Sequence, residues 1–303
     1  MQRLGDVTMQ SRPLQFHASM LFNKIYFFQS LKFEPCTLDN DIRTTTNLFS
    51  DFIPSLQKRF GFLTEFLEID SKQAFVSRLD HIFAECLEGV RPIIHIDMHG
   101  SKTLGLRIEP TGDFLAWEEL ANKCRQINLV CHNNLMLILT SCFGLNSIRN
   151  VTILKPTPYY ALIGAEKNPP GGYIDNQFPG FYETLLTELD IDKALEHISE
   201  HYKLYLSEEH FAVAFTKYIR EGCMGKGKQM RVEKLVSDHL VSQDSYPKLK
   251  LRDARKLIKE NIRPSPDKFE FYKNRFLLAN DIANRGRFNL NIEDISSFLK
   301  ENL

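Results

Sequence analysis

The chain of 303 residues lacks an excess of charge, a long apolar run and a signal-like start. Its 38 Lys and Arg balance 38 Asp and Glu, so net charge does not favour binding to nucleic acid or to a membrane surface. No apolar run reaches the roughly 18 residues of a membrane span, and the N-terminus has no charged-then-apolar pattern. We therefore expect neither membrane spanning nor secretion.

Closely paired cysteines are also lacking. No two of the six cysteines are spaced as CxxC, and in a chain of this length they predict no disulfide framework. Their spacing matches no usual zinc motif either. The sequence thus predicts a reduced, cytoplasmic protein without a cysteine-based zinc site, and we expect no cofactor. The cysteines are Cys36, Cys86, Cys124, Cys131, Cys142 and Cys223.

The two ends of the chain differ in charge. Residues 201–303 carry 20 Lys and Arg against 14 Asp and Glu, so this part is about +6 and residues 1–200 are about −6. We predict one α/β domain over residues 1–200 and an all-helical extension over residues 201–303. Helical patterns cover residues 178–189, 192–206, 208–221, 228–242, 249–262, 266–284 and 292–301.

Residues 92–144 contain two apolar runs that end in chemically active side chains. The run over residues 92–100 is rich in isoleucine and ends at His99, and the run over residues 134–144 ends at Cys142. Each pattern predicts a buried strand. A polar hairpin and an amphipathic helix between them form a crossover, so the two strands are expected to be parallel neighbours. His99 and Cys142 would then lie side by side at one edge of the sheet.

The preceding residues repeat the same alternation of strand and helix. Residues 24–31 and 62–69 predict strands, and residues 46–61 and 70–89 predict helices that end at glycines. This alternation of strands and helices is typical of a mainly parallel sheet with helices on both faces. His95, Asp97 and His99 alternate along one strand and are expected on one face. We interpret His95 as structural.

A thiol beside an imidazole has a definite chemical use. The imidazole of His99 can take the proton of Cys142, because a thiolate rather than a thiol is the nucleophile. Gly100 allows a substrate backbone to approach closely. The backbone amides of Gly100 and Cys142 are candidates for an oxyanion hole. The predicted chemistry is acyl transfer from a peptide bond to Cys142.

A strand ending in His99-Gly100, followed some forty residues later by one ending in Ser141-Cys142, resembles the caspase-like cysteine peptidases. These include caspases, metacaspases, separase, gingipains and the bacterial CHAT proteins. The resemblance continues, in order, through residues 159–166, Asp175, Phe178, residues 181–186 and residues 192–195, and it covers roughly residues 20–200.

The resemblance implies a three-layer αβα sandwich and a cysteine endopeptidase of prokaryotic type that acts on proteins or peptides without a metal. Prokaryotic relatives are often immune or cell-death effectors that stay silent until a partner, a cleavage or a small nucleotide signal releases them. By analogy, this chain would serve antiviral defence, and its helical extension would receive the nucleotide signal or a protein partner.

The resemblance also bears on the first substrate pocket. Metacaspases carry an aspartate two residues before the nucleophile, whereas this chain has Thr140 there. Relatives that cut after Lys or Arg need an acidic residue, for which Asp175, Glu166 and Asp97 are candidates, with Asp175 preferred. Cleavage after aspartate would need an arginine, and Arg43 is the candidate.

Three other interpretations compete with the peptidase. The chain could be a catalytically silent caspase-like scaffold that binds a protein partner, although such a scaffold has no need for both His99 and Cys142. The extension could bind nucleic acid, but its modest charge and lack of interleaved aromatics do not predict sequence-specific recognition. Finally, residues 197–201 match the HxxEH pattern of inverted zinc peptidases, but no acidic third ligand follows, and we favour a solvated helix face.

Overall fold

The computed structural model describes residues 20–31, 48, 52–170, 173–241 and 251–295. The strands are β1 (Lys24–Ser30), β2 (Leu63–Glu68), β3 (Pro92–Ser101), β4 (Gly105–Ile108), β5 (Asp113–Leu115), β6 (Met136–Leu139), β7 (Ala161–Ala165) and β8 (Tyr202–Leu206). The helices are α1 (Ile53–Phe60), α2 (Lys72–Leu87), α3 (Trp117–Val130), α4 (Tyr173–Glu188), α5 (Ile191–Glu196), α6 (Ser207–Gly222), α7 (Gly225–Val241), α8 (Leu251–Asn261) and α9 (Pro266–Leu277).

The main sheet has the strand order β2-β1-β3-β6-β7-β8. The first five of these strands are parallel to their neighbours, and β8 runs antiparallel to β7. The hairpin β4-β5 continues from the end of β3, where Gly100 pairs with Leu106. The predicted crossover between β3 and β6 is confirmed, with α3 as its helix, and β3 and β6 pair directly.

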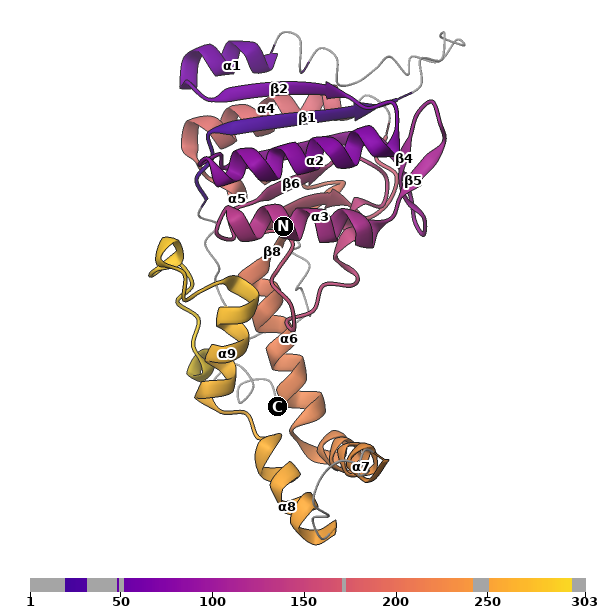
Figure 1. Cartoon of the computed structure of the whole chain (residues 1–303). Coiled ribbons are helices and arrows are strands. Elements are labelled where there is room, and N and C mark those ends of the chain that lie inside the picture. Colours follow the sequence, from indigo (N-terminus) through magenta and orange to yellow (C-terminus); the bar gives the residue numbers. More distant parts are fainter. Residues whose placement is uncertain (1–19, 32–47, 49–51, 171–172, 242–250, 296–303) are drawn as a thin grey trace.

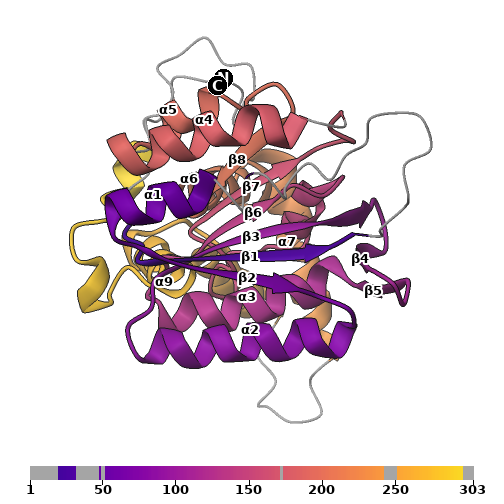
Figure 2. The same cartoon turned by 90° about the horizontal axis from the view of Figure 1, so that it is seen from above.

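Helices cover both faces of this sheet, as Figure 2 shows. Alternate strand residues such as Ile93 and Ile138 pack in one core with helices α1, α4 and α5. The intervening residues, such as Ile94 and Leu137, pack in a second core with α2 and α3. Because side chains alternate along a strand, a strand buried on both faces must be apolar at nearly every position. The predicted αβα sandwich with a mainly parallel sheet is confirmed.

The C-terminal helices extend away from the sheet (Figure 1). Near the sheet, α6 and α9 pack through aromatic rings, with Phe269 5.3 Å from Phe211 and 5.1 Å from Phe215 between ring centroids. Farther out, α7 and α8 share a small separate cluster formed by Val232, Val236 and Ile262. The extension therefore contains two separate packed regions, one near the sheet and one at its outer end.

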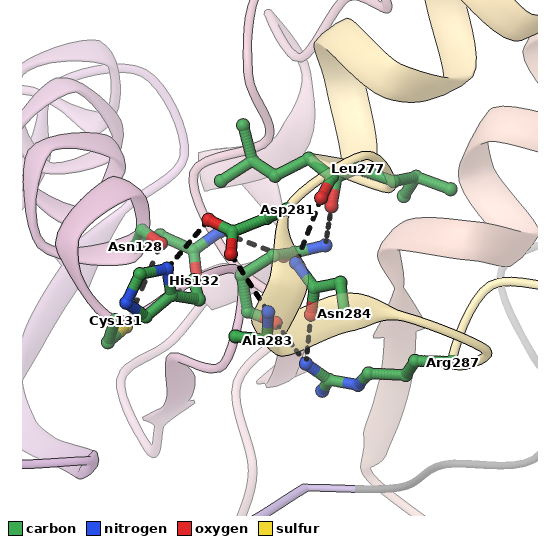
Figure 3. Close-up of polar contacts among 10 residues, drawn as sticks. Asn128, Cys131, His132, Leu277, Asp281, Ala283, Asn284 and Arg287 are labelled. Carbon is green, nitrogen blue, oxygen red and sulfur yellow. Dashed lines mark hydrogen bonds and ion pairs between the residues drawn. The ribbon is translucent and has the colours of Figure 1, made fainter.

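The segment after α9 returns to the amino-terminal edge of the sheet (Figure 3). His132 Nδ1 lies 2.7 Å from Asp281 Oδ2, and the guanidinium of Arg287 donates to the Asn133 carbonyl at 2.8 Å. The Asn133 side chain in turn donates to the Leu277 carbonyl at 2.9 Å. These polar contacts join the extension to the loop between α3 and β6.

Some predicted elements need correction. The helix predicted over residues 192–206 is wrong, because α5 ends at Glu196 and Tyr202–Leu206 form β8 inside the main sheet. The sheet thus continues past residue 200. Residues 151–154 form no strand, and the helix predicted over residues 266–284 already ends at Leu277. Residues 202–206 form a strand because they pair with β7, although their helical periodicity alone predicted a helix.

Within the part of the chain that the structure describes, no helix is both long enough and apolar enough to cross a membrane.

Candidate active site

The ends of β3 and β6 lie side by side at the carboxyl edge of the sheet. Ile96 is the register partner of Leu139, and the amide of Thr140 donates to the Ile96 carbonyl at 3.1 Å. Counting on from this register places His99 and Cys142 at corresponding positions, three residues beyond the last pair. The structure therefore brings together the two strand ends that the sequence predicted.

The backbones of Gly100 and Cys142 approach each other closely. A Cβ added to Gly100 would lie 3.1 Å from the Cys142 nitrogen and 2.9 Å from its carbonyl carbon, and it would overlap the carbonyl oxygen. Only glycine avoids this clash, because every other residue carries a Cβ. The role expected of Gly100 was close approach by a substrate, but in the structure the close neighbour is the backbone of Cys142 itself.

The side chains that precede the candidate pair share one face of the sheet. Ile93 on β3 and Ile138 on β6 both belong to the core formed with α4. Two residues after each, His95 contacts Tyr182 of α4, and the Thr140 hydroxyl donates to Asp97 Oδ1 at 3.1 Å. Continuing this alternation directs His99 toward the same face.

Tyr202 of β8 packs on that face, next to the end of β6. Tyr202 is buried in the same core, and its pKa is raised by burial and by the negative charge of Asp97. Its hydroxyl donates to the carbonyl of Thr140 at 3.3 Å. Sequence reasoning missed Tyr202 because residues 202–206 were assigned to a helix. The alternation of large apolar residues in β8 was the available signal.

A sharp turn follows the candidate nucleophile. Phe143 has a left-handed backbone with φ of 59°, and the short 3-10 helix Gly144–Ile148 begins immediately after it. A Cβ on Gly144 would lie 2.7 Å from the Cβ of Leu139, so the chain folds back against the strand it has just left. This turn ends β6 and leaves Cys142 at its edge.

His99 and Cys142 differ in exposure. His99 is exposed and Cys142 is half-buried. Burial raises the pKa of the Cys142 thiol above its ordinary value. Among the described residues, no hydrogen bond joins the His99 ring to the Cys142 sulfur. In this arrangement the thiol is protonated, and a base would have to remove its proton.

His95 lies deep in the core behind these residues. It is completely buried, and its Nδ1 lies 2.7 Å from the Tyr182 hydroxyl. Its ring contacts Phe27 and Phe178 with centroid separations of 5.5 and 5.4 Å. Burial lowers the pKa of His95 to about 3, so the ring is neutral at physiological pH. This environment agrees with a structural role.

The four candidate pocket residues have different surroundings. Asp97 is buried and accepts the Thr140 hydroxyl. Glu166 is exposed directly after the end of β7, one strand beyond β6. Asp175 lies in the first turns of α4, and its side chain is outside the described part. Arg43 lies outside the described residues altogether.

The two histidines of the HxxEH pattern do not share a helix. His197 follows the end of α5, and its Nε2 lies 2.9 Å from the Thr184 hydroxyl. His201 instead packs against Tyr173, with ring centroids 4.6 Å apart. The helix face favoured for this pattern is therefore absent, because the segment is a turn leading into β8. Within the described ranges, no three His, Cys, Asp or Glu side chains cluster as metal ligands do.

The fold and the two strand ends together define an αβα sandwich with a histidine and a cysteine at the carboxyl edge of its sheet. Comparison with solved structures adds distant likenesses. In one of them, the chain is similar to a solved complex of the Porphyromonas gingivalis RgpB pro- and mature domains, with 12% identity and a TM-score of 0.38. The match covers 63% of this chain and 50% of that one, so it spans about half the length of the relative. No family model matches the sequence, and no curated protein does.

Proposed function

We propose that this chain is a caspase-like cysteine endopeptidase of prokaryotic type that hydrolyses peptide bonds through His99 and Cys142. The observation that carries the proposal is the meeting of two strand ends. β3 and β6 are paired neighbours, and the backbone of Gly100, next to His99, contacts the backbone of Cys142. A base and a nucleophile must lie within reach of one another, and this pairing supports such a placement.

Each residue has a defined step in the reaction. The His99 ring takes the proton of the Cys142 thiol as sulfur bonds to the substrate carbonyl carbon, and the carbonyl electron pair moves onto oxygen. The amides of Gly100 and Cys142 are proposed to hold that oxyanion, a contact that typically lowers a barrier by about 3 to 4 kcal/mol. The tetrahedral intermediate then collapses and expels the amine, which takes the proton from His99.

A water molecule then completes the cycle. His99 removes a proton from this water as the water oxygen attacks the acyl-enzyme, and the thiolate leaves and regains its proton. The acid product departs and the starting thiol is restored. The raised pKa of Cys142 is compatible with this sequence, because the proton need leave only when substrate is bound.

The first substrate pocket is proposed to lie beyond β6 and β7, where Glu166 and Asp175 are found. An acidic residue there would accept a lysine or arginine side chain. Asp97 remains a third candidate, and Arg43 is the candidate for a pocket that accepts aspartate. The proposal extends to a signal-activated immune or cell-death effector, in which a nucleotide or a protein partner acts through the helical extension.

The test is cleavage of fluorogenic peptides that end in Arg, Lys, Asp, Leu or Tyr. Wild type, His99→Ala and Cys142→Ala are compared with and without a cell extract as a source of activator. We expect turnover by wild type and a loss of about 10³-fold or more in both variants. Cys223→Ala, which removes a thiol from the extension, is the matched control and should retain activity.

The same peptides identify the pocket. If wild type cuts after Arg or Lys, then Glu166→Gln or Asp175→Asn should raise KM for that substrate. If it cuts after Asp, Arg43→Gln should do so. Turnover that persists in Cys142→Ala would refute the proposed nucleophile.

A catalytically silent scaffold is the second candidate. The raised pKa of Cys142 and the lack of a hydrogen bond between its sulfur and the His99 ring favour it, since both describe a thiol that is not activated. Silence of wild type and both variants under every condition would support the scaffold. A partner captured equally by wild type and Cys142→Ala would then identify its role.

A further inference from the structure

The outer end of the helical extension carries a row of cations. Arg252, Lys256 and Lys259 are all exposed on α8. At about 100° per residue these three positions fall within a sector of roughly 60°. Arg263 follows two residues after the helix ends and is exposed as well. We call these four residues the α8 cation stripe, and at about 1.5 Å per residue it is roughly 16 Å long.

Two exposed acids of α8, Asp253 and Glu260, lie next to this stripe, but no ion pair among the described residues joins them to it. Within the described segments, none of its four residues takes part in an ion pair, whereas the adjacent Arg255 contacts Glu233 at 2.8 Å. Residues 224–263 contain 11 Lys and Arg against 5 Asp and Glu. That difference of +6 equals the entire excess of residues 201–303. The chain as a whole is neutral, but residues 224–263, which we call the tip of the extension, are basic.

The position of the tip leaves it accessible. α8 lies at the end of the extension farthest from the sheet (Figure 1). An open hollow of about 670 Å³ runs along the helix, and its lining includes all four stripe residues together with Arg255, Asp253 and Glu260, so cations outnumber acids there by five to two. A long, linear ligand could lie there without meeting the α/β domain.

The surroundings of the stripe decide what kind of ligand fits. Ala254 of α8 and the nearby Ile262 are buried on the side turned away from the stripe, and Ile262 packs against α7. Leu251 and Leu257 are exposed, but at about 100° per residue they lie at least roughly 80° around the helix from the stripe, so a ligand that contacts the stripe need not bury them. Cations at roughly one per helical turn suit a ligand with regularly repeated negative charges, and a duplex carries one phosphate about every 3.4 Å along each strand.

We propose that the helical extension binds the phosphate backbone of duplex nucleic acid, independently of sequence, through the α8 cation stripe. Phosphate contacts position a protein without reading bases. No Phe, Tyr or Trp that could stack on a base lies among the described residues between 224 and 263. The sequence argued against sequence-specific recognition, and backbone binding is consistent with that.

The test is fluorescence anisotropy of the full-length chain with a labelled 30-base-pair duplex, as DNA and as RNA, over 50 to 200 mM KCl. About four phosphate contacts predict a slope of log K against log salt near −3.6, or roughly a 10²-fold loss of affinity over this range. The triple change R252E/K256E/K259E should weaken binding at least about tenfold and flatten the slope, and R252Q/K256Q/K259Q should do so less strongly.

The matched control is K58E/R78E/K155E, which changes net charge equally but at exposed positions of the α/β domain. It should bind as wild type does, and circular dichroism should show all variants folded. Equal weakening by the control would overturn the proposal, as would unchanged binding by both stripe variants. So would binding to phosphatidylserine vesicles or polyglutamate without binding to either duplex, or no binding at 50 mM KCl. Preference for DNA or RNA distinguishes the source of the phosphates.

Discussion

The α-carbon of Gly100 faces the carbonyl of Cys142 so closely that a Cβ at Gly100 would lie 2.9 Å from the Cys142 carbonyl carbon. This contact joins the residue after the candidate base to the candidate nucleophile. Any side chain at position 100 must push the two strand ends apart, and with them His99 and Cys142. The distance between the ends of β3 and β6 therefore depends on a glycine at position 100.

Gly100→Ala should lower peptidase activity about 10²-fold while leaving most of the fold intact. The added Cβ forces a shift of the β3 end or of the turn at Cys142, and displacement of about 1 Å can cost roughly 10²-fold in rate. Activity and thermal unfolding should be measured together. Gly112→Ala is the control, since its Cβ would meet only Arg107 Nη2 at 4.0 Å, although its φ of +75° costs some stability. Full activity in Gly100→Ala would contradict the inferred close approach.

The Cys142 thiol should react with iodoacetamide only at high pH in the free protein. Burial raises its pKa, so the thiolate fraction at neutral pH is smaller than for an ordinary cysteine, whose pKa is about 8.5. The rate of alkylation at Cys142, followed by mass spectrometry of its peptide, should rise through an apparent pKa above that value. A midpoint below pH 8 would show instead that the resting site holds a thiolate.

His95 should make the protein less stable in acid. Its pKa is about 3 when folded and about 6.5 when unfolded, so the unfolded state binds more protons between these values. Its contribution is therefore complete above pH 6.5 and is lost, at up to about 1.4 kcal/mol per pH unit, as pH falls toward 3. Urea unfolding of wild type and His95→Gln between pH 4 and 7 measures this slope. Identical slopes would contradict the prediction.

The pair of His132 and Asp281 should contribute modestly to the docking of the segment after α9. The hydrogen bond from His132 lowers the pKa of Asp281, so this contribution is present above the unfolded pKa of about 3.9 and is lost as pH falls through the lower folded value. Both side chains are partly exposed, and we expect a coupling of only about 0.2 to 1 kcal/mol.

A double-mutant cycle with His132→Ala and Asp281→Asn, read by urea unfolding at pH 6, measures this coupling. Asn is used because Asp281 Oδ1 also accepts the amide of Ala283, and an amide oxygen can keep that bond. A coupling of zero at pH 6, or one that grows at pH 3, would show that the contact does not stabilise the fold.

Much of the α/β domain was predictable from local patterns. The apolar runs ending at His99 and Cys142 identified β3 and β6, and the amphipathic segment between them identified the crossover helix α3. Because parallel neighbours end at the same edge of a sheet, the sequence alone also predicted that these two residues lie at one edge. Local periodicity is enough to predict a strand or a helix where the segment is strongly apolar and bounded by turns.

Tertiary contacts decided the remainder. Ile198, Tyr202 and Tyr205 are spaced as on a helix, yet residues 202–206 form β8, because antiparallel pairing with β7 satisfies their backbone. That pairing brings Tyr202 to the carbonyl of Thr140, which no spacing in the sequence suggested. Similarly, the cations of α8 are visible in the sequence, but packing of Ile262 against α7 fixes which side of the helix faces solvent. Residue types determined the chemistry available, whereas contacts between distant segments determined which side chains meet.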